Sequence, residues 1–252
     1  ENNQLAGNPC GFNQKNTMTA KDKTLAMHIY IILGALFICS LVVSNLIFQK
    51  FFYWDFFGLY TFEISVGILP YPITFLITDL ISEIYGKKMA NRVVTAGIFA
   101  SVFSLLIVSA GQVVPATDWS PIDDGLFDQV FGATVLAVLA SMIAYLLAQY
   151  IDIHLYHFWK NLTKGKHLWL RNNFSTFLSQ FVDTASVLFL LCVFGKIDWA
   201  LFGGLLLSGY LFKVIVAACD TPFMYLGVAL FRKRFNMEKH QEIDLSYSQT
   251  TD

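Results

Sequence analysis

Charged side chains are scarce in this sequence of 252 residues, because Asp, Glu, Lys and Arg together make up only 14% of it. A typical soluble domain contains about 25% charged residues. Apolar residues make up 56% of the chain, with 24 Phe, 11 Tyr and 5 Trp. The formal net charge of −1 provides no basic surface for a nucleic acid. The composition therefore excludes an ordinary soluble domain or a nucleic-acid-binding protein, and it indicates a membrane protein.

Cysteine is also rare, and the four residues Cys10, Cys39, Cys192 and Cys219 have neither CxxC nor zinc-like spacing. His154 and His157 have an i, i+3 spacing, which is a weak metal signal and is better explained by histidines near lysines at the membrane surface. The patterns HExxH, GxSxG, Walker A and GxGxxG are absent. We therefore expect no metal, no cofactor and no enzymatic activity.

Six long apolar segments are candidates for membrane-spanning helices, because about 20 helical residues cross the hydrocarbon core. Three contain no charged residue: 28–49, 93–117 and 129–151. Three carry internal charges: 62–85, 173–195 and 199–231. The sequence predicts an all-α polytopic membrane protein with six transmembrane helices, divided into a polar N-terminal segment (1–26), a transmembrane domain (27–232) and a C-terminal tail (233–252).

Basic residues alternate between the links that join these spans. Lys and Arg gather before the first span and after the second, fourth and sixth, whereas the link after the third contains four Asp and no Lys or Arg. Positive residues mark the cytoplasmic side of a membrane protein. We therefore predict that both termini are cytoplasmic.

The segment 62–85 contains two prolines near its middle, Pro70 and Pro72. Proline removes an intrahelical hydrogen-bond donor and clashes with the preceding turn, so we predict that this span is broken at the two prolines. A broken helix is tolerated in lipid only where it is buried in protein or lines a cavity. Such helices mark binding sites in secondary transporters.

Two acids follow this break one helical turn apart, Asp79 and Glu83. Asp79 is deep enough in the span to be a candidate cavity residue. Glu83 is close to a helix end, and it could equally be a surface acid that pairs with Lys87 or Lys88.

A polar stripe recurs at helical spacing in segment 173–195, formed by Thr176, Gln180 and Asp183. Such a stripe can be a hydrogen-bonded seam between helices. Asp183, however, lies near the middle of its span, where a charge costs about 2.5–3.5 kcal/mol on insertion scales. We therefore expect Asp183 to face a ligand or a partner.

Lys213 lies in the middle of the last span and raises the same question. An internal ion pair with Asp183, Asp79 or Asp220 would lower its insertion cost without any ligand. Acids, one lysine, amides and aromatic rings together suit a small planar polar ligand better than a lipid or a bare ion.

Five stretches of the sequence resemble the queuosine precursor transporter family, bacterial six-span membrane proteins that are also called the VUT family. They are SNLIFQ (44–49), PYPITFLITDLISEIYGKKMANR (70–92), AQYIDIHLYHFWK (148–160), LWLRNNFSTFLSQFVDT (168–184) and FKVIVAACDTPFMYLG (212–227). They occur in this order and cover nearly the whole membrane part. Asp220 is not part of the family pattern.

The resemblance implies an inner-membrane protein that imports 7-deazaguanine bases such as 7-cyano-7-deazaguanine, the precursors of queuosine in tRNA. It implies a 7-deazaguanine base and the lipid bilayer as partners, no nucleic acid, and it leaves a homodimer open. The positions that it carries over as substrate-binding candidates are Asn45, Asp79, Glu83, Gln149, Asp152, Arg171, Ser175, Thr176, Gln180, Asp183 and Lys213.

Other readings of the sequence stay open. A substrate-binding membrane subunit of a larger importer would have similar size and polarity, and an intramembrane enzyme is a weaker alternative because no nucleophile has a recognisable partner. A shared Thr-Phe-Leu followed by an acid, at 74–79 and 176–183, suggests an inverted repeat of three plus three spans. The coupling of transport to a proton is not determined by these residues.

Overall fold

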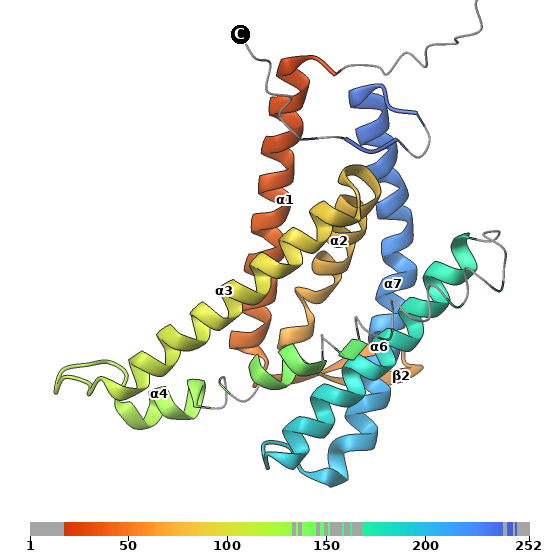
Figure 1. Cartoon of the computed structure of the whole chain (residues 1–252). Coiled ribbons are helices and arrows are strands. Elements are labelled where there is room, and N and C mark those ends of the chain that lie inside the picture. Colours follow the sequence, from red (N-terminus) through yellow and green to blue (C-terminus); the bar gives the residue numbers. More distant parts are fainter. Residues whose placement is uncertain are drawn as a thin grey trace, which may run out of the picture.

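The computed structural model describes residues 18–132, 168–238, 241–243 and 245, together with 135, 138–144, 147, 148, 151, 158 and 162; the side chains of 168–176 and 221 lie outside this description. Figure 1 shows the elements and their labels. They are α1 (Ala20–Ile47), β1 (Phe51–Phe56), β2 (Tyr60–Ser65), the 3-10 helix η1 (Val66–Ile68), α2 (Tyr71–Tyr85), α3 (Lys87–Val113), α4 (Asp124–Phe131), α6 (Leu168–Val193) and α7 (Trp199–Phe235).

Within the described residues, four helical segments are long and apolar enough to cross a membrane: Ala20–Ile47, Val66–Tyr85, Lys87–Val113 and Trp199–Phe235. The chain is therefore a mostly helical, multi-pass membrane protein. The described apolar part of α6 is shorter, at Phe177–Val193. The predicted span 129–151 is described only in part, at 129–132, 135, 138–144, 147, 148 and 151, so the number of six spans stays a prediction.

The segment between α1 and α2 is an antiparallel hairpin, which corrects the all-α prediction. Phe57 and Gly58 at its turn have positive φ values of 52° and 71°, as type I′ hairpin turns require. Trp54 of β1 stacks on Phe62 of β2 at 5.5 Å between ring centroids and meets Phe212 of α7 edge-on at 5.7 Å. In β1 both faces carry aromatic side chains, which hides the strand. In β2 the residues Tyr60, Phe62 and Ile64 alternate with Thr61, Glu63 and Ser65, a strand signal that we overlooked because we assigned 62–85 to one apolar span.

The two prolines begin a helix and do not break one. Pro70 immediately precedes α2, with a φ of −75°, and Pro72 lies in its first turn. Proline is well tolerated there because the N–H groups of the first turn have no intrahelical acceptor. Segment 62–85 is therefore not one continuous helix, as predicted. The part before the prolines, however, is a strand and one 3-10 turn, where we expected a first half-helix.

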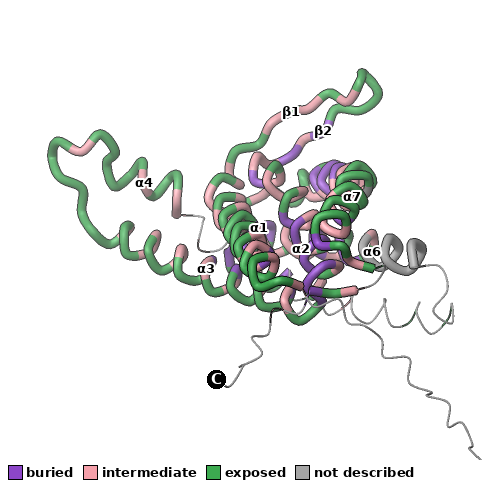
Figure 2. The backbone as a smooth tube through the Cα atoms, turned by 90° about the horizontal axis from the view of Figure 1, so that it is seen from above, coloured by how far each residue is buried: buried purple, intermediate pink, exposed green. Residues whose placement is uncertain are grey.

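The helices α1, α2 and α7 form the centre of the bundle, and α6 packs on the half of α7 nearer the hairpin (Figure 1). Seen from above, buried residues lie among these helices, whereas the far half of α3 and α4 extend away from them and are mostly exposed (Figure 2). Among the exposed side chains of α3 are Phe99, Phe103 and Leu106. We expect this apolar surface to face lipid.

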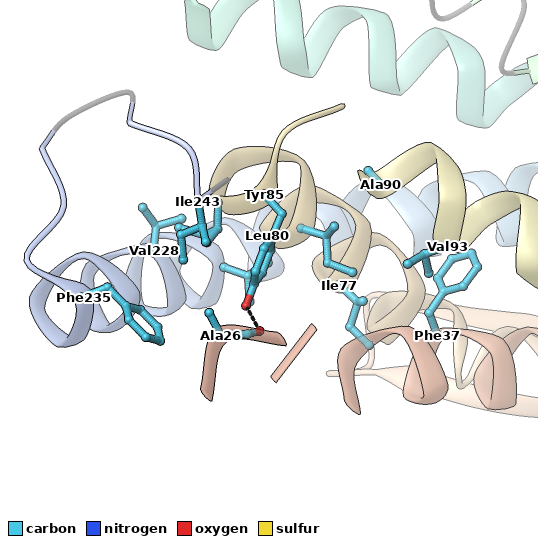
Figure 3. Close-up of a cluster of buried hydrophobic side chains, with 12 residues drawn as sticks. Ala26, Phe37, Ile77, Leu80, Tyr85, Ala90, Val93, Val228, Phe235 and Ile243 are labelled. Carbon is cyan, nitrogen blue, oxygen red and sulfur yellow. Dashed lines mark hydrogen bonds between the residues drawn. The ribbon is translucent and has the colours of Figure 1, made fainter. Parts of the chain in front are cut away.

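The largest buried cluster lies where α1, α2, α3 and α7 meet, at the end of the bundle away from the hairpin (Figure 3). Ile81 and Ile84 of α2 are fully buried there. The hydroxyl of Tyr85 donates a hydrogen bond of 2.8 Å to the carbonyl oxygen of Ala26, so that this phenol is satisfied inside the apolar cluster. The bond ties the end of α2 to the beginning of α1.

Gly67 of η1 touches the backbone of α1 so closely that no side chain fits. A Cβ atom at this position would lie 2.6 Å from the carbonyl oxygen of Ser44 and 2.9 Å from Cα of Phe48. The hydroxyl of Ser44 also donates to the carbonyl oxygen of Gly67. The chain enters α2 from this contact, so Gly67 sets the position of the first residues of α2.

Replacing Gly67 with Ala is therefore expected to lower the free energy of unfolding by about 1–3 kcal/mol, the usual cost of overpacking. The measurement is thermal unfolding of the purified protein in detergent. Gly204→Ala in α7 is the matched control, because its Cβ meets nothing within 4 Å and alanine in a helix gains about 0.5–1 kcal/mol over glycine. Equal unfolding temperatures for the two variants would contradict the prediction.

Candidate functional site

A buried ion pair joins α6 to α7 inside the bundle. Nζ of Lys213 lies 2.7 Å from Oδ2 of Asp183, and the two side chains are only 10% and 9% exposed. The hydroxyl of Tyr71 donates to the same carboxylate oxygen at 2.6 Å. The Lys213 ammonium also lies 4.3 Å from the centroid of the Tyr71 ring, within the range of a cation–π contact. Three helices thus meet at one carboxylate.

Each member of this cluster is held in place by its own helix. Tyr71 is the first residue of α2 and is fixed by an edge-on contact with Phe75, 4.7 Å between ring centroids. The hydroxyl of Thr74 donates 2.6 Å to the carbonyl oxygen of Tyr71. The helices α6 and α7 approach closely beside the ion pair, because a Cβ at Gly209 would lie 3.3 Å from Cγ2 of Thr184. The carboxylate is therefore positioned by rigid helices and not by a loop.

Gln180 lies one turn from Asp183 on α6 and is 7% exposed. Its Oε1 is buried and has no hydrogen-bond partner among the described residues. An unpaired buried amide oxygen costs about 1–3 kcal/mol, so such a group is typical of a place that a ligand or a water fills. Further buried polar residues of α2, α6 and α7 are Thr74, Ser179, Thr184 and Ser208.

This arrangement suits a neutral polar ligand. Lys213 balances the charge of Asp183, so the pair can lie within the membrane without a net charge. The hydrogen bonds of Tyr71 and Lys213 both end at Oδ2, so Oδ1 of the carboxylate can accept a donor from a ligand. Together with Oε1 of Gln180, the cluster offers two acceptors one helical turn apart.

Glu83 forms a second ion pair, with Arg232 of α7, at 2.6 Å between Oε1 and Nη2. Of the two readings that the sequence left open for Glu83, the pairing with Lys87 or Lys88 is wrong. Gly86, with a φ of 83°, ends α2 and turns the chain, so that both lysines begin α3 and are exposed. Glu83 lies 12 residues after Tyr71, about 18 Å along the helix axis, and thus far from the buried cluster.

The remaining candidates are placed as follows. Asp79 is exposed on α2, about 12 Å along the axis from Tyr71, and Asn45 is half-buried near the end of α1. The side chains of Arg171, Ser175 and Thr176 lie outside the description although their backbone belongs to α6, and Gln149 and Asp152 lie outside the described residues. The structure therefore brings together Gln180, Asp183 and Lys213 out of the predicted set.

Sequence reasoning missed Tyr71, which now completes the cluster. Its signal was available, because it is the residue between the two prolines that begin α2. For metals, the part of the chain that the structure describes contains no group of three His, Cys, Asp or Glu side chains that could hold an ion. The two histidines with i, i+3 spacing, His154 and His157, lie outside the described residues.

Comparison with known proteins assigns the chain to a family and finds two similar proteins. Residues 65–227 match the profile of a family described as "Putative vitamin uptake transporter". A Bacillus subtilis (strain 168) protein named "Probable queuosine precursor transporter" is 28% identical over 165 residues, 64% of this chain and 70% of that protein. An Escherichia coli (strain K12) protein named "Queuosine precursor transporter" is 26% identical over 129 residues, 51% of this chain and 55% of that protein. No solved structure matches the chain.

Proposed function

Because the chain belongs to the vitamin uptake transporter family, we propose that it imports queuosine precursors, 7-deazaguanine bases such as 7-cyano-7-deazaguanine, across a bacterial inner membrane. The names of its two relatives support this substrate class. The observation that carries the proposal is the buried Asp183–Lys213–Tyr71 cluster within the membrane-crossing part, since buried charges in such a place mark a substrate pathway.

The chemistry of the base fits this cluster. A 7-deazaguanine has adjacent N–H donors on one edge, and a carboxylate can accept paired donors. Oδ1 of Asp183 and Oε1 of Gln180 are the two acceptors that would receive them. The carbonyl oxygen of the base would accept a hydrogen bond from Lys213 once the ammonium shifts away from Asp183.

Transport requires the site to open alternately toward each side of the membrane. We infer that the pair of Glu83 with Arg232 closes the cytoplasmic end, because it joins α2 to α7 at the end that carries the basic cluster 232–234. The tail reinforces this contact, since the N–H of Ile243 donates 2.7 Å to the carbonyl oxygen of Ile84. Opening would break these bonds and release the base into the cell.

In the proposed three-plus-three repeat, α2 of the first half corresponds to α6 of the second half. The hydrogen bond between Tyr71 and Asp183 joins these two helices, whereas the proposed repeat rests on the Thr-Phe-Leu followed by an acid that both helices contain. Six spans with both termini in the cytoplasm complete this proposed topology. The other proposed binding residues, Asn45 and Asp79 among them, are to be tested one by one by uptake, and for Glu83 a charge exchange with Arg232 decides between binding and closure of the cytoplasmic end.

A selective thermal shift tests the substrate class. At 100 times its dissociation constant, a bound ligand adds about 2.7 kcal/mol of stability, or roughly 5–11 °C for a domain of 150–250 residues. We expect this shift with 7-cyano-7-deazaguanine or 7-aminomethyl-7-deazaguanine and none with guanine as a control. Uptake by the purified protein in liposomes would exclude the need for a partner ATPase. No shift with any deazaguanine would contradict the proposal.

A further inference from the structure

A separate polar cavity lies at the other end of the molecule from the Glu83–Arg232 pair. Its volume is about 550 Å³. The residues that line it are Phe48, Gln49, Phe51, Gln112, Asp128, Gln129, Gly132, Lys196 and Ile197. We call it the outer cavity. Neither Asp183 nor Lys213 is among its lining residues, and Asp183 lies 10 residues before the end of α6, about 15 Å along the axis.

The outer cavity is built where three separate links of the chain converge. The end of α1 with the start of β1, the end of α3 with α4, and the α6–α7 link all contribute side chains. Figure 1 shows these segments at the same end of the molecule, away from the C-terminus. They are the three links that the alternation of basic residues places outside the cell. A substrate arriving from outside therefore meets this cavity first.

The side chains of the cavity are already oriented by hydrogen bonds. The amide nitrogen of Gln112 donates 3.2 Å to Oδ1 of Asp128, and that of Gln49 donates to the carbonyl oxygen of Val130. The carboxylate of Asp128 therefore retains Oδ2 as an acceptor, and Gln49 retains its amide oxygen. Lys196 forms no ion pair with any residue in the described ranges.

The outer cavity thus repeats the chemistry of the buried cluster at a more accessible place. It combines a carboxylate, an amide oxygen and an ammonium group, with Phe48 and Phe51 beside them. A carboxylate and an amide oxygen can accept the N–H donors of a planar base, an ammonium can donate to its carbonyl oxygen, and aromatic rings can pack on its face.

We propose that the outer cavity is a first binding site for the 7-deazaguanine base, which occupies it before moving to Asp183. This inference rests on the proposed function. Asp128 binds the donor edge of the base, and Lys196 binds its carbonyl oxygen. Because the site captures the substrate but does not release it into the cell, its loss changes the half-saturating concentration for uptake more than the maximal rate.

The first test compares matched substitutions at this end of the molecule. Asp128→Asn and Lys196→Gln are each expected to raise KM for 7-cyano-7-deazaguanine at least about tenfold, the effect of one lost hydrogen bond to a charged group, with Vmax unchanged. Asp118→Asn and Lys50→Gln are the controls, because both residues are exposed in the same links, as Asp128 and Lys196 are, but neither lines the cavity. A KM unchanged in both cavity variants would overturn the proposal.

The second test detects binding directly and does not require transport. Gln129→Cys is introduced into a chain whose four native cysteines are replaced by serine, and a membrane-impermeant maleimide is added from outside. We expect excess 7-cyano-7-deazaguanine to slow labelling, and to slow it equally when Asp183→Asn is also present. Normal uptake without any protection would overturn the outer site alone. Absence of both uptake and protection in the otherwise unchanged protein would overturn the proposed function as well.

Discussion

Replacing Asp183 with Asn is expected to abolish uptake and to lower the free energy of unfolding by about 3–5 kcal/mol. The loss of stability follows because the ammonium of Lys213, only 10% exposed, would remain buried without its counter-ion. Lys213→Met should cost a similar amount, since it leaves the carboxylate unpaired. The double variant Asp183→Asn/Lys213→Met buries no charge, and its stability should return to within about 1 kcal/mol of the unchanged protein.

Measuring uptake by the double variant shows whether Asp183 and Lys213 bind the substrate or only stabilise the fold. If the carboxylate receives the donor edge of the base, the double variant is stable but its uptake stays reduced at least about 100-fold, the effect of two lost charge-assisted hydrogen bonds. The measurements are unfolding in detergent and initial uptake rates in liposomes. The pair of Asp22 with Arg234 is a matched control, because it is more exposed and its neutralisation should cost less than about 1 kcal/mol. Normal uptake by the double variant would show that the buried pair serves only the packing of α6 on α7.

Reversing the charge of Glu83 is expected to reduce uptake about tenfold, and exchanging both charges is expected to restore most of it. In Glu83→Arg two guanidinium groups would face each other across a gap that is now 2.6 Å wide. Close like charges cost several kcal/mol when they are partly desolvated. The exchange Glu83→Arg/Arg232→Glu restores attraction across the same contact between α2 and α7. Initial uptake rates of the two single variants and the double variant provide the measurement.

The exchange also decides between two roles for Glu83. A residue that closes the cytoplasmic end needs only an opposite charge on its partner, so the exchanged pair works. A residue that binds the base needs its carboxylate at position 83, so the exchanged pair fails. Recovery in the double variant would remove Glu83 from the binding residues, and failure to recover would contradict its proposed role at the closed end.

The residue types of the sequence by themselves determined that this protein lies in a membrane, and they singled out the polar residues inside its spans as candidates for function. Lipid tolerates few charges, so a chain with 14% charged residues makes each internal charge conspicuous. Asp183 and Lys213 could therefore be selected before any fold was known, and Gln180 was selected because it shares a polar stripe at helical spacing with Asp183. Long apolar runs likewise predicted the helices α1, α3 and α7, because their length has to match the thickness of the bilayer. The ordered family motifs added the substrate class that the relatives support.

Only the tertiary structure decided which of these residues meet. Helical periodicity tells which side chains share a face of one helix, but not which other helix covers that face. For Lys213 the sequence left three acids open as partners, and the packing of α6 on α7 selects Asp183. For Glu83 the turn at Gly86 excludes the neighbouring lysines and leaves a partner 149 residues away in the chain, Arg232. The hairpin and the contribution of Tyr71 depend on long-range packing in the same way, because the partner of a strand and a hydrogen bond between distant helices cannot be read from the residues of one segment.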